Sequence, residues 1–265
     1  MNIIGIIPAR MASSRFPGKP LAKINGIPMI GHVFYRSKMA TILNEIYIAT
    51  CDRVIANYIK SIGGQSIITS DSHERASDRT AEAVFKVEKQ KGEQIDIVVM
   101  LQGDEPMITP MMIESAIEPL IKDSKINVSN LMGKISDTEE YVNSNEVKVV
   151  INKEYYALYF SRQSIPSRAK YSGNIPMWKQ LGLIVFRKTA LLDYSSLEPT
   201  CLEKIESVDM NRFIENGKPI KMVPTRYETI GVDTELDLQE AELKLKNDPL
   251  VDKYLFFRKL YSNET

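Results

Sequence analysis

Cysteine and histidine are scarce in this sequence of 265 residues, with two of each. Cys51 and Cys201 stand too far apart for a disulfide framework or a zinc cluster, so we expect two reduced thiols in a cytoplasmic protein. Two histidines also exclude a histidine-rich metal centre. For the same reason we expect no Ser-His-Asp or Cys-His catalytic arrangement.

Long apolar runs and net charge are missing as well. No apolar stretch approaches the ~18 residues that a transmembrane helix needs. Residues 1–7 are too short for a signal peptide and lack its basic leader. The 34 Lys and Arg residues balance the 34 Asp and Glu residues, so no global field favours nucleic acid or a membrane as a partner. Positive charge must therefore act locally.

Three cations gather in the loop after residues 3–8, which have the length and composition of a buried strand. Arg10, Arg15 and Lys19 follow the strand at spacings of five and four, and small residues between them let the backbone lie close to a ligand. A strand, a cationic loop and an amphipathic segment in this order form phosphate sites in open α/β sheets. We interpret the loop as a polyphosphate site; the alternative is a solvated surface loop.

Strands and helices alternate in the first half of the chain. We predict strands at residues 45–50, 65–69 and 95–101, and helices at residues 28–40, 53–62 and 77–90. This alternation predicts a mostly parallel sheet, in which the very apolar strand at residues 95–101 lies centrally.

The pattern changes after Lys122. Residues 147–151 and 156–161 predict a hairpin, and residues 126–187 an antiparallel extension with a dimer surface. Farther on we predict a helix at 209–216, a strand at 219–223 and a helix at 234–246 that begins with a capping box. We divide this single domain into residues 1–125, 126–187, 188–246 and a loosely docked tail, 247–265. Residues 166–177 are the best candidate for a mobile loop.

Two carboxylates stand at the junctions where such a sheet places its chemistry. Asp104 follows the most apolar strand, and Asp233 lies between extended chain and a predicted helix. Brought together, they would form a site for Mg²⁺, which prefers oxygen ligands and keeps positions for phosphate. The alternative is that each acid only caps a helix or a turn.

Two other kinds of phosphate site are excluded. Gly18 and Lys19 are followed by Pro20 and are not preceded by the glycine of a P-loop. No strand is followed by Gly-x-Gly-x-x-Gly, so dinucleotide binding is not expected.

A series of motifs along residues 3–245 closely resembles the 3-deoxy-manno-octulosonate cytidylyltransferases, the CMP-Kdo synthetases. The most specific are residues 8–10 (PAR) with 15–21 (RFPGKPL) and 26–30 (GIPMI), and residues 102–108 (QGDEPMI). The later ones are residues 147–150 (VKVV), 156–162 (YALYFSR) with Ile165 and Pro166, and 231–234 (GVDT).

The resemblance implies a Rossmann-like nucleotidyltransferase sheet with an antiparallel dimerisation extension. It also implies a cytoplasmic, Mg²⁺-dependent homodimer that joins CTP to an acidic keto-sugar, releases pyrophosphate and serves lipopolysaccharide biosynthesis. Residue chemistry agrees, because attack of a sugar hydroxyl on the α-phosphorus needs charge neutralisation and alignment rather than covalent catalysis.

The resemblance assigns roles to the matching positions. Lys19, Arg10 and Asp104 would be catalytic, and Asp104 with Asp233 would hold the metal. The residues that would contact substrates are Pro8, Ala9, Arg15, Asp78, Arg79, Gln102, Arg162, Gln180 and Asp209. Among them, Gln102 and the main chain at Pro8 and Ala9 would lie near the cytidine. Arg162 would face the carboxylate of the sugar acid, which suits a guanidinium fork.

This chain departs from the family pattern at several positions. Residues 75–79 (RASDR) keep the Asp and Arg of the family's Ser-Gly-Thr-Asp/Glu-Arg but add a cation near the base. Gln180 stands for a family His and Ile184 for a Tyr, while Asp209 and Met210 stand for a Glu-Gln pair. A buried polar partner left unmatched costs ~1–3 kcal/mol. Either the acceptor is unchanged despite these replacements, or it is another acidic sugar, such as a different 2-keto-3-deoxy acid, or another anionic compound.

A third hypothesis is a catalytically silent nucleotide-binding homologue. The presence of Lys19, Asp104 and Asp233 argues against it, because a silent protein has no need of a metal pair.

Overall fold

The computed structural model describes residues 1–12, 15–170, 173 and 176–262, without the side chains of residues 256–262. Ser13, Ser14 and part of the 166–177 stretch therefore lie outside the described residues. The chain forms two compact units, one of residues 1–114 with 229–265 and the other of residues 115–228. The sequence-based divisions after residues 125, 187 and 246 differ from these limits, and a functional role for those parts stays a prediction.

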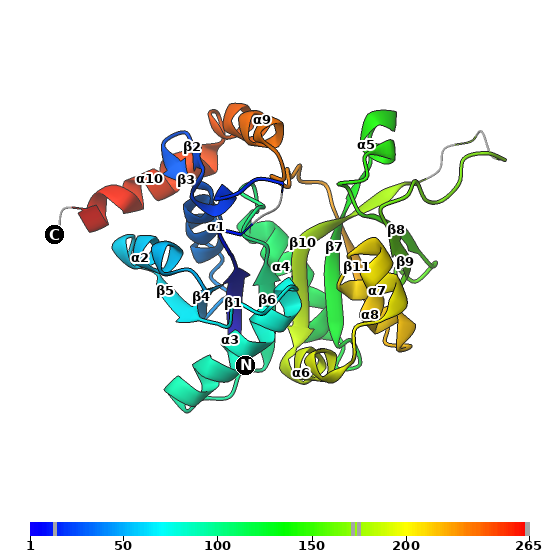
Figure 1. Ribbon diagram of the computed structural model, residues 1–265, viewed down its shortest axis with the longest axis horizontal. Helices are drawn as coiled ribbons and strands as arrows, with labels where there is room; N and C mark the ends of the chain where they lie inside the picture. The colour runs from blue at the N-terminus through cyan, green and yellow to red at the C-terminus, as the bar shows by residue number, and fades with distance from the viewer. Residues whose placement is uncertain (13–14, 171–172, 174–175, 263–265) are drawn as a thin grey trace. The chain divides into compact units, whose positions relative to one another are not determined.

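The first unit contains the predicted parallel sheet. Its strands are β1 (Ile3–Pro8), β4 (Glu45–Thr50), β5 (Gln65–Ile68) and β6 (Ile97–Leu101), with β1 between β6 and β4. All neighbours among these four strands are parallel (Figure 1). Every residue of β1 and β6 is buried, which explains why both read as unbroken apolar runs.

Helices and short strands complete this unit. They are the 3₁₀ helix η1 (Lys19–Leu21), β2 (Lys23–Ile24), β3 (Ile27–Pro28), α1 (Met29–Lys38), α2 (Arg53–Ser61), α3 (Ala76–Lys91), the start of α4 (Pro110–Lys122), α9 (Glu235–Leu245) and α10 (Pro249–Ser262). The helices predicted at residues 28–40, 53–62, 77–90 and 234–246 are confirmed, with ends shifted by at most two residues. In the part of the chain that the structure describes, every helix is too short or too polar to cross a membrane.

The C-terminal helix α10 is fixed to α1 by buried polar contacts. The Nε2 of His32 donates to the carbonyl of Ile24 at 2.8 Å, so its Nδ1 accepts from the hydroxyl of Tyr254 at 2.6 Å. Burial lowers the pKa of His32 to about 4. Arg36, which is 1% exposed, pairs with Asp248 at 2.8 Å just before α10. The prediction of a loosely docked tail is therefore wrong for the beginning of this helix.

The second unit contains the predicted antiparallel strands. β7 (Val128–Lys134) pairs antiparallel with β10 (Trp178–Arg187), and β8 (Lys148–Ile151) pairs antiparallel with both β10 and β9 (Ala157–Ser161). The hairpin predicted around residues 152–154 is thus confirmed. The last strand, β11 (Lys221–Thr225), lies parallel to β7.

In the described part of this unit, four short helices and the end of α4 accompany these strands. The short helices are α5 (Thr138–Val142), α6 (Lys188–Ser196), α7 (Cys201–Glu206) and α8 (Met210–Glu215). Cys201 at the start of α7 is a free thiol, as is Cys51 in the first unit, in agreement with the expectation from sequence.

Candidate active site

The cationic loop is closed by hydrogen bonds that place Lys19 at a fixed point. The N–H of Gly18 donates to the carbonyl of Met11 at 3.0 Å, and the N–H of Met11 donates to Asp52 Oδ2 at 2.8 Å. Gly18 has a φ of 77°, a conformation that a residue with a Cβ adopts only with strain. Lys19 follows directly and begins η1. The left-handed backbone conformation at Gly18 therefore sets the position of Lys19.

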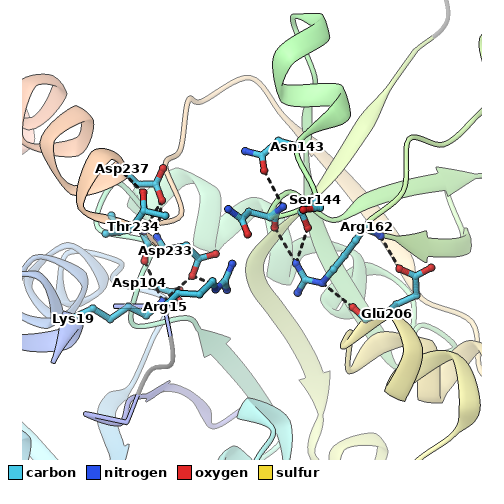
Figure 2. A network of polar contacts seen from close by, with 12 residues as sticks. Arg15, Lys19, Asp104, Asn143, Ser144, Arg162, Glu206, Asp233, Thr234 and Asp237 are labelled. Atoms are coloured by element: carbon cyan, nitrogen blue, oxygen red, sulfur yellow. Dashed lines mark hydrogen bonds and ion pairs between the residues drawn. The ribbon is translucent and has the colours of Figure 1, made fainter. Parts of the chain in front are cut away.

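The Lys19 ammonium meets two carboxylates and a carbonyl (Figure 2). Its Nζ lies 2.7 Å from Asp104 Oδ2, 3.0 Å from Asp233 Oδ1 and 3.1 Å from the carbonyl oxygen of Val232. Both predicted acids are thus within hydrogen-bonding distance of one nitrogen, although 129 positions separate them in the sequence. The side chains are 14% to 24% exposed, so the cluster is accessible to a ligand.

Close packing beside β6 positions Asp104. A Cβ on the preceding Gly103 would lie 3.1 Å from the carbonyl oxygen of Pro8 and 3.0 Å from Ile30 Cδ1. Only glycine fits there without displacing the end of β1. The carbonyl of Asp104 accepts from the N–H of Val232 at 2.9 Å, which joins the segment before α9 to the loop after β6.

Asp233 is held by the capping box that begins α9. The Thr234 side chain accepts from the N–H of Asp237, while Asp237 Oδ2 accepts from the N–H groups of Asp233 and Thr234 at 2.9 and 2.7 Å. Thr234, not Asp233, is therefore the cap residue, as the predicted capping box implies. The carboxylate of Asp233 remains available for Lys19 and for Arg15 Nη2, which lies 2.9 Å from Oδ1 (Figure 2).

Electrostatics keep the Lys19 side chain charged. Burial alone would lower the pKa of Lys19, but the negative charges of Asp104 and Asp233 outweigh this effect and raise the pKa above its ordinary value. The cluster at neutral pH is therefore an ammonium between two carboxylates.

The donor set of this cluster suits a magnesium ion that is shared with phosphates. Among the described residues there is no group of three or more His, Cys, Asp or Glu side chains that could hold a metal by itself. Asp104 and Asp233 offer two carboxylates around one cation position, which Lys19 fills. Mg²⁺ is commonly bound by one or two carboxylates, with substrate phosphates and water as the remaining ligands.

Arg10 and Arg79 meet at a different point of the first unit. Arg10 Nη1 and Arg79 Nη2 each lie 3.3 Å from the carbonyl oxygen of His73. Arg79 is buried and also donates to Thr69 Oγ1 at 2.5 Å and to the Ser70 carbonyl at 3.0 Å. Arg10 is exposed. The predicted convergence of three cations thus has two members, Arg15 and Lys19, at the carboxylate pair.

The other residues expected near the nucleotide also belong to this unit. Pro8 and Ala9 are buried at the end of β1, and the Ala9 N–H donates to the Ala49 carbonyl at 2.9 Å. Asp78 in α3 and Gln102 after β6 are half-buried. Their contacts with a base remain predictions.

In the second unit, Arg162 joins separate loops through main-chain oxygens. Its Nε lies 2.8 Å from the carbonyl of Glu206, and its Nη1 lies 3.0 and 3.2 Å from the carbonyls of Ser144 and Asn145 (Figure 2). The Arg162 N–H also donates to the Glu206 carboxylate at 2.8 Å. The predicted contact with a sugar acid is not tested by these bonds.

The positions that depart from the family pattern lie in the same unit. Gln180 is half-buried, and its Nε2 donates to Asn130 Oδ1 at 2.7 Å. Asn130 in turn donates to the carbonyls of Leu181 and Leu183 at 2.8 and 2.9 Å, which fixes the orientation of both amides. Ile184 is 2% exposed and belongs to the core.

Asp209 and Met210 stand at the beginning of α8. Asp209 is its N-terminal flanking residue and is half-buried, whereas Met210 is fully buried. Met210 therefore fills the core in place of a polar side chain.

Sequence reasoning missed two charged residues that organise the second unit. Lys148 is fully buried and donates to the carbonyls of Asn143, Glu146 and Arg162 at 2.6, 2.9 and 2.9 Å. Glu206 accepts from the hydroxyls of Tyr159 and Ser161, each at 2.7 Å. A single lysine inside an apolar strand pattern was the available signal for Lys148. Glu206 has no comparable signal.

The chain is similar to known proteins over most of its length. The family model described as cytidylyltransferase matches residues 4–220. The 3-deoxy-manno-octulosonate cytidylyltransferase of Geotalea uraniireducens is 42% identical over 256 residues, which cover 93% of this chain and 100% of that protein. The enzyme of the same name from Geobacter metallireducens is 40% identical over 255 residues, 92% of this chain and 98% of that protein.

A solved structure is similar over the same extent. It is described as CMP:2-keto-3-deoxy-manno-octonic acid synthetase complexed with CTP, and it matches with a TM-score of 0.84 at 34% identity. The match covers 93% of this chain and 99% of the solved chain.

Proposed function

Because this chain belongs to the 3-deoxy-manno-octulosonate cytidylyltransferase family, we propose that it joins CTP to 3-deoxy-manno-octulosonate (Kdo), giving CMP-Kdo and pyrophosphate. Membership of this family makes the chain a nucleotidyltransferase. The acceptor and the roles of individual residues are proposed below.

The proposed triphosphate site is supported by one observation, a cluster of four charged side chains. Lys19, Arg15, Asp104 and Asp233 come from three distant stretches of the sequence and form one hydrogen-bonded cluster at the end of β6. Such a cluster has charges of both signs, as required to bind a triphosphate and to balance its developing charge. Conservation of the overall fold alone would not require these four side chains to meet.

In the proposed reaction, Lys19 and Arg15 bind the triphosphate and hold the α-phosphorus in line with the attacking hydroxyl. Arg10 adds a third positive charge from the same loop. Asp104 and Asp233 would hold Mg²⁺, which supplies charge neutralisation for the phosphate oxygens and the leaving pyrophosphate. Gln102, the main chain at Pro8 and Ala9, and the pair Asp78 and Arg79 are proposed to bind the cytidine.

On the acceptor side we propose roles for Arg162, Gln180 and Asp209. Arg162 would pair with the carboxylate of the sugar acid by exchanging main-chain partners for carboxylate oxygens. Gln180 would present an amide whose orientation Asn130 fixes. A second candidate acceptor, another anionic compound, is favoured by one observation: Ile184 and Met210 are buried and apolar where the family has polar side chains.

We further propose that the enzyme is a cytoplasmic homodimer. The β8–β9 hairpin exposes Leu158, which is 56% accessible, and so offers an apolar contact for a second copy. Two free thiols suit a reducing compartment.

Pyrophosphate release from CTP with Mg²⁺ tests the function directly. We expect release when Kdo is the acceptor. Release only with another acidic acceptor would replace Kdo in the proposal. No release with any acceptor, from protein that is folded by circular dichroism, would favour the silent nucleotide-binding homologue instead. Light scattering of the purified full chain tests the dimer.

A further inference from the structure

The hydrogen-bonding capacity of Lys19 is fully used. An ammonium has three donors and no acceptor. Lys19 Nζ has three partners within 3.1 Å: Asp104 Oδ2, Asp233 Oδ1 and the carbonyl oxygen of Val232. A phosphate oxygen can therefore be bound only if Lys19 gives up at least one of these partners.

The charges of the cluster also cancel. Lys19 and Arg15 carry two positive charges, and Asp104 and Asp233 carry two negative charges. Lys19 Nζ and Arg15 Nη2 even share one oxygen, Asp233 Oδ1, at 3.0 and 2.9 Å. A divalent cation added to this neutral group would meet two positive groups close to its own ligands. Coulomb repulsion between like charges in a partly buried site opposes such binding.

A triphosphate removes both obstacles at once. Its oxygens accept from Lys19 and Arg15, which frees the carboxylates, and its negative charges compensate an added cation. Asp233 can keep its place during this exchange, because the capping box of Thr234 and Asp237 holds its main chain independently of either cation.

We propose that Lys19 and Arg15 act as internal counter-ions of the two carboxylates and thereby exclude divalent cations. The exclusion ends when a triphosphate binds these two cations in place of the carboxylates. Metal and nucleotide then enter the site as a coupled pair. This inference rests on the proposed function, since it takes the triphosphate to be the ligand that moves the two cations.

Binding of Mn²⁺ to the full chain, followed by electron paramagnetic resonance in the absence of nucleotide, tests the exclusion. We expect weak binding by the wild type and an affinity about tenfold or more higher for Lys19→Met, which is within the usual range of coupling between sites. Arg15→Met should give a smaller increase, about threefold, because the charge of Arg15 is more exposed to water than that of Lys19 and is screened more strongly. The side chain of Arg15 is 44% exposed, so this variant tests the proposal even if Lys19→Met does not fold.

Lys23→Met is the matched control. It also removes one positive charge, but from an exposed position on β2, and it should bind Mn²⁺ like the wild type. Equal affinities for the wild type, Lys19→Met and Arg15→Met would overturn the proposal, as would a gain in Lys23→Met as large as that in Lys19→Met. These comparisons use no CTP and no acceptor. A failed exclusion is therefore distinguishable from a failed function, which would show as no pyrophosphate release with any acceptor.

Discussion

Lys19 in the first unit and Lys148 in the second have the same number of hydrogen-bond partners and opposite electrostatics. Each ammonium has three acceptors within 3.1 Å. Two of the acceptors of Lys19 are carboxylates, and these raise its pKa against the effect of burial. All three acceptors of Lys148 are main-chain carbonyls, and burial lowers its pKa.

This difference distinguishes charged residues that are suited to bind ligands, such as Lys19, from charged residues that hold loops in place, such as Lys148. Two of the three partners of Lys19 are charged side chains. Phosphate oxygens can replace these carboxylates as partners of Lys19, and a cation can replace Lys19 as the partner of the carboxylates. The partners of Lys148 are neutral main-chain oxygens of two segments, the loop at Asn143 and Glu146 and the chain at Arg162, which the ammonium holds together. The arginines repeat the contrast, since Arg15 pairs with a carboxylate and Arg162 joins main-chain carbonyls.

A substitution at Asp104 should have the largest effect, and it tests whether the charges around Lys19 serve catalysis. We expect Asp104→Asn to lower kcat by about 10³-fold, because it removes the negative charge proposed to hold the Mg²⁺ that neutralises the reacting phosphates, while leaving the side-chain shape nearly unchanged. Pyrophosphate release measures the loss, and thermal unfolding should stay close to that of the wild type. Retained turnover would contradict the role assigned to this carboxylate.

Replacing each lysine by methionine sharpens the contrast. Lys148→Met should lower the free energy of unfolding of the second unit by about 3 kcal/mol, since it removes three hydrogen bonds made by a fully buried ammonium. Trp178 in β10 is the only tryptophan of the chain, and its fluorescence in a urea titration reports this unit. Lys19→Met should cost less than about 1 kcal/mol, because its carboxylates are accessible to water. Similar losses would contradict the distinction.

Lowering the pH tests whether the stability of the first unit depends on the neutral form of the buried His32. His32 has a folded pKa of about 4, below its ordinary value of 6.5. Its contribution is therefore complete above pH 6.5 and is lost as the pH falls toward 4, by about 2 kcal/mol at pH 5. Hydrogen exchange of α1 peptides at pH 7 and pH 5, corrected for intrinsic rates, should show this loss. His32→Gln should show a smaller change between the two pH values; an equal change would assign the loss to other groups.

The smallest effect is expected at Gln180. If the acceptor is Kdo, Gln180→His should raise kcat/KM for Kdo by a few-fold, since it restores the imidazole typical of the family without changing the first unit. Initial rates of pyrophosphate release measure the change, with Gln163→His, an exposed replacement of the same kind, as the control. A lower kcat/KM would indicate that the amide is matched to a different acceptor.

The positions of Asp104 and Asp233 were predictable because the elements beside them follow regular sequence patterns. Asp104 ends the most apolar strand, and Asp233 precedes a capping box, so local patterns place each at a junction between elements. Lys19 was predicted from the cationic loop as a triphosphate contact, not as the shared partner of the two acids. Its third bond, to the Val232 carbonyl, depends on how two loops close and has no sequence signal.

β7 was not predicted, because polar residues interrupt its pattern. Ser129 and Asn130 are fully buried, yet they resemble loop residues in the sequence. Ser129 Oγ donates to the Ala116 carbonyl and Asn130 to carbonyls of β10, so tertiary partners satisfy both. Such compensation is visible only once the chain is folded. The main-chain partners of Arg79 and Arg162 escaped prediction for the same reason.

Arg36 in α1 has a practical meaning for handling this protein. Its guanidinium contacts the carbonyls of Met107 and Ile108 and the carboxylate of Asp248, so one buried charge fastens the loop beyond Gly103 to the start of α10. A purification tag joined to the last residue leaves that charge paired. A deletion that begins before Asp248 leaves the buried guanidinium without this counter-ion.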